Sequence, residues 1–155
     1  MKTKANTVLT GYQNKCQICS YKKLDTVLSL GHQSIVQAYL NEEELHLPEV
    51  TYPLNLCRCK KCGLLQLDYI INPAEVFPKD YPYLTGMTNM LIRNFRSLAQ
   101  KLITTYGLTS KDLVVDIGSN DGTLLAGFKE QNIRVFGVEP TNAARIAIKN
   151  GVPTM

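Results

Sequence analysis

The feature that most constrains the fold is an apolar stretch that ends beside an acid and enters a loop with two glycines. Residues 113–117 are Leu-Val-Val-Asp-Ile, and the loop at 118–122 is Gly-Ser-Asn-Asp-Gly. A short β-branched run bounded by glycine is typical of a buried strand, and glycine permits the positive φ of a tight turn. A helical pattern follows near 122–131. The stretch therefore predicts a strand, a turn and a helix in direct succession.

A second strand that leads into an acid follows this helix. Residues 134–138 are again apolar, Glu139 comes next, and a further helix is expected near 141–150. Two strands joined through a helix are typical of a parallel α/β sheet, in which ligands bind at the carboxyl ends of the strands. An acid at the second strand end can accept hydrogen bonds from both hydroxyls of a ribose. The pattern predicts a site for a nucleoside cofactor.

The glycine spacing narrows the choice of cofactor. The loop is D-x-G-x-x-x-G, formed by Asp116, Gly118 and Gly122, and it lacks the middle glycine of the G-x-G-x-x-G loop that binds pyrophosphate. A nicotinamide dinucleotide is therefore disfavoured, and S-adenosylmethionine fits better. Asp116 would attract its cation, and the amides of residues 118–122 would meet its carboxylate or ribose oxygens. The alternative is a plain strand-turn-helix in which Asp116 and Asp121 only cap the turn.

Five cysteines precede this region in two clusters. Cys16 and Cys19 form one C-x-x-C pair, and Cys59 and Cys62 form the second about forty residues later. Two such turns can supply the four thiolates of a tetrahedral zinc site. The spacing therefore predicts structural zinc on these four cysteines. Cys57 would replace one of these four ligands if the register of the second cluster were shifted.

Other readings of the cysteines are weaker. Free buried cysteines would act as small hydrophobic side chains, but paired spacing is not expected of them. A redox C-x-x-C normally begins a helix in a thioredoxin-like pattern, which neither pair has. A zinc site with four protein ligands has no open position for a substrate, so we expect no catalysis there. Its role here would be to fold a segment too small to bury a sufficient core.

The chain divides into a zinc-binding domain at residues 1–72, a linker at 73–84 and a third region at 85–155. In the first, residues 51–56 and 63–67 are expected to be strands of a hairpin around the second cysteine pair. The linker is rich in proline, which fixes φ and removes a backbone donor. The third region opens with a helix whose apolar stripe recurs at three- and four-residue steps, ending at Gly107.

Composition limits the partners of the chain. Hydrophobic residues make up 45% and charged residues 19%, as in globular proteins, and the formal net charge is only +4. The pairs Lys22-Lys23 and Lys60-Lys61 are too short to indicate a nucleic-acid surface. No apolar run approaches the roughly 18 residues that span a bilayer. We expect neither nucleic acid nor a membrane as a partner, and a cytoplasmic location.

The loop and the second cysteine pair carry a family resemblance. Residues 114–125 and the Gly-Val-Glu-Pro of residues 137–140 look like the first two cofactor motifs of class I methyltransferases. Residues 59–67, Cys-Lys-Lys-Cys-Gly-Leu-Leu-Gln-Leu, resemble the C-x-x-C-G-L-x-Q-L of the nucleotide-sugar C-methyltransferases. Residues 30–34 are similar to that family's L-G-x-Q-P, with Ser34 in place of proline. Tyr81-Pro82-Tyr83 resembles its Y-x-Y segment.

The resemblance implies an α/β fold class with two parts. A small four-cysteine zinc-binding domain would be followed by a helix and the first strands of a truncated, Rossmann-like class I methyltransferase domain. Only two strands of the seven that such a domain needs are expected here, which favours a fragment or a split reading frame. The implied cofactor contacts are Asp116, Gly118, Asn120, Gly122 and Glu139, with Tyr81 and Tyr83 near cofactor or substrate.

The implied function is methyl transfer to a carbon of a keto-deoxysugar nucleotide, within deoxysugar biosynthesis. No residue of the chain is expected to be the catalytic base, so the fragment alone is expected to be inactive. Its partners would be the nucleotide-sugar substrate and either a C-terminal half or a dimer partner. The alternative is a zinc-stabilised module that binds nucleic acid or a protein, which would need basic and aromatic side chains around the cysteines.

Overall fold

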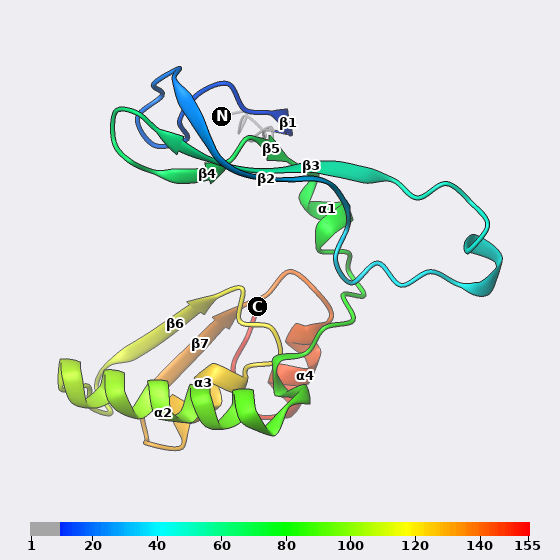
Figure 1. The fold of residues 1–155 in the computed structure, drawn as a ribbon. Coiled ribbons are helices and arrows are strands. Elements are labelled where there is room, and N and C mark those ends of the chain that lie inside the picture. The colour runs from blue at the N-terminus through cyan, green and yellow to red at the C-terminus, as the bar shows by residue number, and fades with distance from the viewer. Residues whose placement is uncertain (1–9) are drawn as a thin grey trace, which may run out of the picture. The chain divides into compact units, whose positions relative to one another are not determined.

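The computed structural model describes residues 10–155, which form two compact units (Figure 1). One unit ends at Val76, and the other comprises Phe77–Met155. No helix in residues 10–155 has both the length and the apolar character needed to cross a membrane. The mixture of helices and strands confirms the predicted α/β class in its general form.

The first unit is built mainly of antiparallel strands. A three-stranded sheet has the order β2-β3-β4, and β1 pairs with β5 in a second, two-stranded sheet. The predicted hairpin around the second cysteine pair is confirmed, because β3 and β4 are antiparallel neighbours. The elements are β1 (Gly11–Tyr12), β2 (Leu24–Ser34), the 3-10 helix η1 (Glu42–Glu44), β3 (Thr51–Cys59), β4 (Leu65–Leu67), β5 (Tyr69–Ile70) and α1 (Pro73–Val76).

The second unit is a parallel α/β arrangement. Strands β6 and β7 pair in parallel, with Val115 opposite Phe136, and their bounds are those expected from the sequence. The chain then returns beside β7, where Thr154 forms a parallel bridge to Gly137. The elements are the 3-10 helix η2 (Thr85–Met87), α2 (Asn89–Tyr106), β6 (Leu113–Ile117), α3 (Thr123–Lys129), β7 (Arg134–Val138) and α4 (Ala143–Lys149).

Helix α2 begins and ends where its sequence indicates. The Thr88 hydroxyl accepts a hydrogen bond from the Leu91 amide at the start of the helix. At its end, Gly107 takes a left-handed conformation with φ of 61°, and its amide donates to the Ile103 carbonyl. Both features are standard helix caps, and they confirm the predicted end at Gly107.

The core of the second unit lies where the helices meet β7. Helix α3 packs against α2 and β7, and α2 comes so close that a Cβ on Gly127 would lie 3.1 Å from that of Ala99. The opposite face of β6 is open, and Ile117 is 83% exposed. The buried cluster consists of Ala99, Leu125, Phe128, Ile133, Val135, Ala147 and Val152.

Candidate metal centre and ligand cavity

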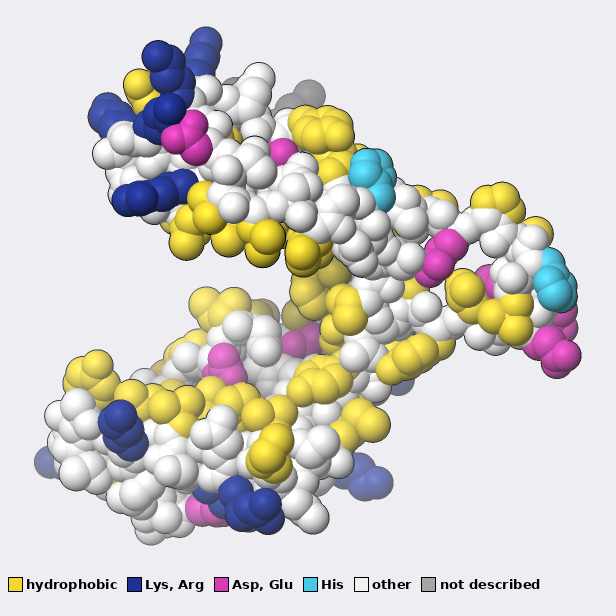
Figure 2. All heavy atoms as spheres, viewed as in Figure 1, with side chains coloured by type: hydrophobic (Ala, Val, Ile, Leu, Met, Phe, Trp, Pro, Cys, Tyr) yellow, Lys and Arg dark blue, Asp and Glu magenta, His cyan; other side chains and the backbone are white. Residues whose placement is uncertain are grey.

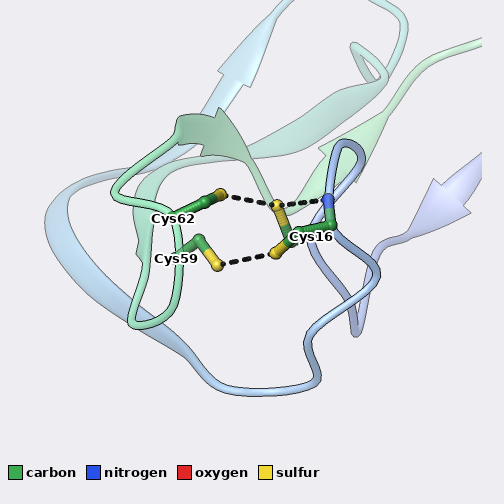
Figure 3. A group of neighbouring side chains, drawn as sticks. Cys16, Cys59 and Cys62 are labelled. Atoms are coloured by element: carbon green, nitrogen blue, oxygen red, sulfur yellow. Dashed lines mark hydrogen bonds between the residues drawn. The ribbon is translucent and has the colours of Figure 1, made fainter.

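The four predicted ligand cysteines lie together in the first unit. Their sulfur atoms are all within 4.8 Å of one another. Cys16 Sγ is 3.5 Å from Cys62 Sγ, and Cys19 Sγ is 3.6 Å from Cys59 Sγ (Figure 3). Thiolates bound to one tetrahedral zinc at about 2.3 Å stand about 3.8 Å apart. The donor set and its spacing therefore suit a zinc ion.

The first cysteine pair lies on a tight turn. The Ser20 amide donates to the Cys16 carbonyl over 2.9 Å, and the Cys16 amide donates to the Tyr21 carbonyl over 2.9 Å. Ser20 has a φ of 57°, which few non-glycine residues adopt. The Cys19 amide points back to Cys16 Sγ at 3.5 Å. This amide is the main cause that lowers the pKa of Cys16.

The second pair repeats this backbone. The Gly63 amide donates to the Cys59 carbonyl over 3.0 Å, and the Cys59 amide donates to the Leu64 carbonyl over 2.8 Å. Gly63 has a φ of 77°, so the positive φ falls four residues after the first cysteine in both turns. The amides of Cys62 and then Lys61 lower the pKa of Cys59 to about 6. Both turns thus direct N–H groups at sulfur, which favours the thiolate form that binds metal.

Gln66 joins the two cysteine turns, a role that the sequence did not reveal. Its side chain is buried on β4, where Oε1 accepts from the Gln17 amide over 2.9 Å and Nε2 donates to the Lys15 carbonyl over 3.2 Å. Gln66 therefore holds the first turn against the strand that follows the second. Its place in the motif at 59–67 was the only sequence signal of this role.

Cys57 lies outside the group of four. It is buried on β3, with Sγ 3.8 Å from the Thr26 hydroxyl. Its exclusion from the sulfur cluster argues against the shifted register considered from the sequence.

Positive side chains surround the second cysteine turn. Figure 2 shows Lys and Arg side chains, in dark blue, gathered at one end of the first unit. Arg58, Lys60 and Lys61 line a polar hollow of about 570 Å³ there, and Lys60 Nζ lies 3.0 Å from Asp25 Oδ1. Four thiolates on one Zn²⁺ would carry a net charge of −2. These cations would offset part of it.

In the second unit, a cavity of about 420 Å³ opens at the carboxyl ends of β6 and β7. This is the edge at which parallel α/β sheets bind their ligands, and the volume is in the usual range for small-molecule sites. Gly118 has a φ of 83°, and a Cβ placed on it would meet no atom within 4 Å. A ligand can therefore approach the backbone there. The lining residues are Phe77, Tyr81, Ile117, Gly118, Asn120, Glu139, Pro140 and Thr141.

The Glu139 carboxylate connects two segments that line this cavity. Its Oε2 accepts from the Asn120 amide over 2.9 Å, and its Oε1 accepts from the Thr141 amide over 2.9 Å and hydroxyl over 2.6 Å. Glu139 as a whole residue is only 8% exposed. It thus fixes the loop after β6 relative to the start of the segment after β7. A carboxylate has about four acceptor positions, so Glu139, which lines the cavity, keeps capacity for a further hydrogen bond.

Four amides of the loop after β6 have hydrogen-bond partners within the protein. The amides of Gly118 and Ser119 both donate to the Val138 carbonyl, over 2.8 and 3.2 Å. The Asn120 amide donates to Glu139, and the Gly122 amide donates to the Ser119 carbonyl over 3.0 Å. These four amides thus already donate to protein oxygens, and their expected contact with cofactor oxygens stays a prediction. The loop closes on β7 and satisfies its own donors.

Asp116 is a half-buried carboxyl on β6, next in sequence to Ile117 but not itself among the residues that line the cavity. Burial and then the negative charge of Glu139 raise its pKa. Among residues 10–155, no hydrogen-bond donor faces its side chain within bonding distance. A half-buried carboxylate without a partner attracts a cation. Asp116 therefore suits a positively charged ligand group.

The structure separates the other predicted cofactor residues. Tyr81 lines the cavity, where its ring packs against that of Phe77 with centroids 5.4 Å apart. Tyr83 is not among the lining residues. Gly122 is buried elsewhere, and a Cβ on it would lie 3.1 Å from side-chain atoms of Ala147 and Val152. Gly122 thus serves packing. The sequence did not single out Phe77, Ile117, Pro140 and Thr141, which also line the cavity.

The capping alternative holds for one of the two acids. Asp121 Oδ1 accepts from the amide and the hydroxyl of Thr123, over 3.1 and 2.6 Å, at the start of α3. Asp116 has no such role among the described residues. The turn is therefore capped by Asp121, while the Asp116 side chain has no hydrogen-bond partner among residues 10–155.

Together these features define a class: a four-cysteine β unit of metal-binding type, followed by a parallel α/β unit with a cavity at its strand ends. Residues 16–77 match a family model described as "Putative zinc binding domain". Over 143 residues, 92% of its length, the chain is 32% identical to the C-methyltransferase NovU of Streptomyces niveus. The chain spans about a third of that relative, 34% of its length. The matches confirm the resemblance to C-methyltransferases that the motifs predict.

Proposed function

We propose that the chain is the zinc-binding and cofactor-binding part of an S-adenosylmethionine-dependent methyltransferase. Its acceptor would be a carbon of a keto-deoxysugar nucleotide. The observation that carries the proposal is the cavity between Gly118 and Glu139 at the strand ends. The similarity to a C-methyltransferase supports the reaction class. The proposed division remains a zinc-binding domain at 1–72, a linker at 73–84 and a methyltransferase portion at 85–155.

A Rossmann-like arrangement is part of this proposal. The parallel pair β6 and β7, with α3 between them in sequence, is the unit from which such sheets are built. The bridge between Thr154 and Gly137 extends the parallel order on the other side of β7. Ile117 and Val115 leave the open face of β6 apolar, as expected of strands that are covered on both faces in a larger sheet.

Zinc would be held by Cys16, Cys19, Cys59 and Cys62. Its chemistry there is structural, because four protein thiolates leave no open position for a substrate. The cysteine turns supply N–H donors to sulfur, and Gln66 fixes the distance between the turns. The role of the site is to hold the first unit in one conformation.

S-adenosylmethionine fits the second site through charge and space. When bound, it supplies an electrophilic methyl group on a positively charged sulfur. Asp116 would favour that positive charge, Glu139 would accept from ribose hydroxyls, and Gly118 would allow close contact with the backbone. Phe77 and Tyr81 would exclude water from one side. Removal of the proton from the acceptor carbon is assigned to no residue of this chain.

Metal analysis of the full purified chain tests the zinc site. We expect about one zinc per chain, retained in Cys57→Ser and lost in Cys62→Ser. The two variants make the same chemical change five residues apart, so they separate ligand loss from the loss of any thiol. Less than half an equivalent of zinc in the wild type after reconstitution would contradict the assignment.

Isothermal titration of S-adenosylmethionine into the full chain tests the cofactor site. We expect saturable binding that Asp116→Asn weakens, because the substitution keeps the shape of the side chain and removes its charge. S-adenosylhomocysteine lacks the positive sulfur, so the same substitution should affect its binding less. Absence of binding to the wild type would remove the proposal.

A further inference from the structure

Residues 79–86 form a strap that is attached to the second unit at two points. At the first point, the Asn142 amide donates to the Lys79 carbonyl over 2.7 Å. The Asn142 side chain also donates to the Asp80 carboxylate. Asn142 immediately precedes α4, so this end of the strap is held at the segment that follows β7.

The second point lies on the loop that follows β6. Asn120 Oδ1 accepts from the Thr85 amide over 2.8 Å, and Asn120 Nδ2 donates to the Tyr83 carbonyl over 3.0 Å. The neighbouring Asp121 accepts from the Gly86 amide at Oδ2 over 2.7 Å. Three hydrogen bonds thus connect the strap to two adjacent side chains of the loop.

The contact is also close in space. A Cβ on Gly86 would lie 2.9 Å from the Thr123 hydroxyl oxygen and 3.0 Å from Asp121 Oδ2, so a larger residue would push the strap away. Asn120 has a φ of 51°; its side chain bonds to the strap and its backbone amide bonds to Glu139. One residue therefore links the strap, the loop and the acid of the cavity.

Tyr81 lies between the two attachment points and lines the cavity with Phe77. Both polar groups of the Asn120 side chain are already used by the strap. We infer that Asn120 is a positioning residue, whose carboxamide holds the strap in place as a wall of the cavity rather than binding the ligand. This inference rests on the proposed function for the identity of the ligand, S-adenosylmethionine.

The test uses Asn120→Gly in the full chain. Glycine removes the carboxamide and accepts the positive φ without strain. Asn132→Gly is the matched control, because Asn132 is exposed, has a φ of 60° and lies outside the cavity. Hydrogen exchange of peptides covering 79–88 and titration with S-adenosylmethionine are measured for both. We expect faster exchange in the strap and about 10-fold weaker binding in Asn120→Gly only.

Thr85→Pro removes the same hydrogen bond from the other side. Thr85 is the first residue of η2, where proline is tolerated, and Asn120 stays intact. It should reproduce the faster exchange and part of the affinity loss. The double variant should bind no more weakly than Asn120→Gly within about 2-fold, because both changes break one shared bond. Independent effects that multiply would contradict the inference.

The outcomes separate the inference from the proposed function. Weaker binding by Asn120→Gly with unchanged strap exchange would mean direct contact with the ligand and would overturn the inference. Faster exchange with unchanged affinity would also overturn it. If the wild type binds no S-adenosylmethionine, the proposed function fails. Unchanged strap exchange in Thr85→Pro overturns the inference even if Asn120→Gly does not fold.

Discussion

At the scale of single residues, the half-buried carboxyl of Asp116 affects the folding stability of the chain in a way that depends on pH. Its pKa is raised by burial and then by the charge of Glu139. The folded chain therefore holds the Asp116 proton more tightly than the unfolded chain does. Its contribution to stability is fully present below the unfolded pKa of about 3.9 and is lost as pH rises through the folded pKa. At neutral pH the ionised carboxylate opposes folding.

Asp116→Asn should therefore melt at a higher temperature than the wild type at pH 7, and the difference should shrink toward pH 4. Asp112 provides a control of opposite sign, since the Thr109 amide and hydroxyl lower its pKa. Asp112→Asn should destabilise the chain at pH 7, and that loss should shrink as pH falls. Thermal melts at both pH values measure the two variants. A lower melting temperature for Asp116→Asn at pH 7 would contradict the assigned environment.

Gln66 is a second residue whose effect can be measured. Gln66→Ala would leave the Gln17 amide and the Lys15 carbonyl without their partner, at a cost of about 1–3 kcal/mol in the free energy of unfolding. Zinc affinity should fall as well, because the two cysteine turns lose their link. Denaturant titration and competition with a zinc chelator test both effects.

Gln33→Ala is the control for Gln66, since Gln33 is exposed in the same sheet. Its side chain makes one bond, to the Leu30 carbonyl. The control should match the wild type in zinc affinity. Equal zinc affinity in Gln66→Ala and the wild type would show that the cysteine turns position themselves without this side chain.

At the scale of elements, the close contact of α2 and α3 depends on small residues. Gly127 faces Ala99, which is fully buried, and a Cβ on Gly127 would lie 3.4 Å from the backbone of Arg96. Leucine cannot be placed there unless the helices separate. Gly127→Leu should lower the free energy of unfolding of the second unit by about 1–3 kcal/mol or more.

Ser97→Leu is the matched control, because Ser97 lies on the exposed side of α2. Leucine is a better helix former than serine, so this variant should be neutral or slightly more stable. Urea denaturation followed by the helical circular dichroism signal measures both variants. Equal stabilities for Gly127→Leu and the wild type would refute the close contact.

The bounds of the elements were predictable where local signals act alone. The strands at 113–117 and 134–138 follow from β-branched runs, and α2 follows from its stripe and the glycine at its end. The length of β2, which runs from Leu24 to Ser34 and passes through Gly31, does not follow from such local signals. β2 pairs with β3 along this whole length, with two register shifts. The sequence of one segment does not reveal which strand it will pair with.

At the scale of the whole molecule, the two units are stabilised differently. Within residues 10–76, the buried residues are Cys16, Cys57, Cys59 and Gln66, so the first unit has no aliphatic core in its described part. The second unit buries a cluster that includes Leu125, Phe128 and Val152. The candidate metal centre therefore takes the place of a core in the first unit.

Zinc removal should consequently unfold the first unit and spare the second. A strong chelator at neutral pH should abolish protection from hydrogen exchange in β2 and β3. The helical signal of α2 should remain, since that helix belongs to the second unit. Readdition of zinc should restore the exchange pattern. Cooperative loss of both signals would contradict separate stabilisation.

The sequence by itself determined where the two candidate sites lie along the chain. Cysteine spacing placed four thiols on two turns, and the glycine and acid pattern located a ligand edge on two parallel strands. Both depend on neighbours within a few residues, which local backbone geometry controls. The sequence did not determine whether Cys57 joins the metal group. Cys57 and Cys59 point to the same face of β3, so the answer depended on where along this strand the first cysteine turn docks.

Only the tertiary structure decided how the ligand edge is built. Asn120 bonds to Thr85, 35 residues away, and its amide bonds to Glu139, 19 residues away. Such contacts follow from how distant segments pack, and no spacing rule encodes them. Because of the same packing, loop amides that the motif suggested as cofactor contacts donate to protein carbonyls. Asn120 and Glu139 were visible in the sequence as candidate site residues, but their partners and the other lining residues were set by the fold.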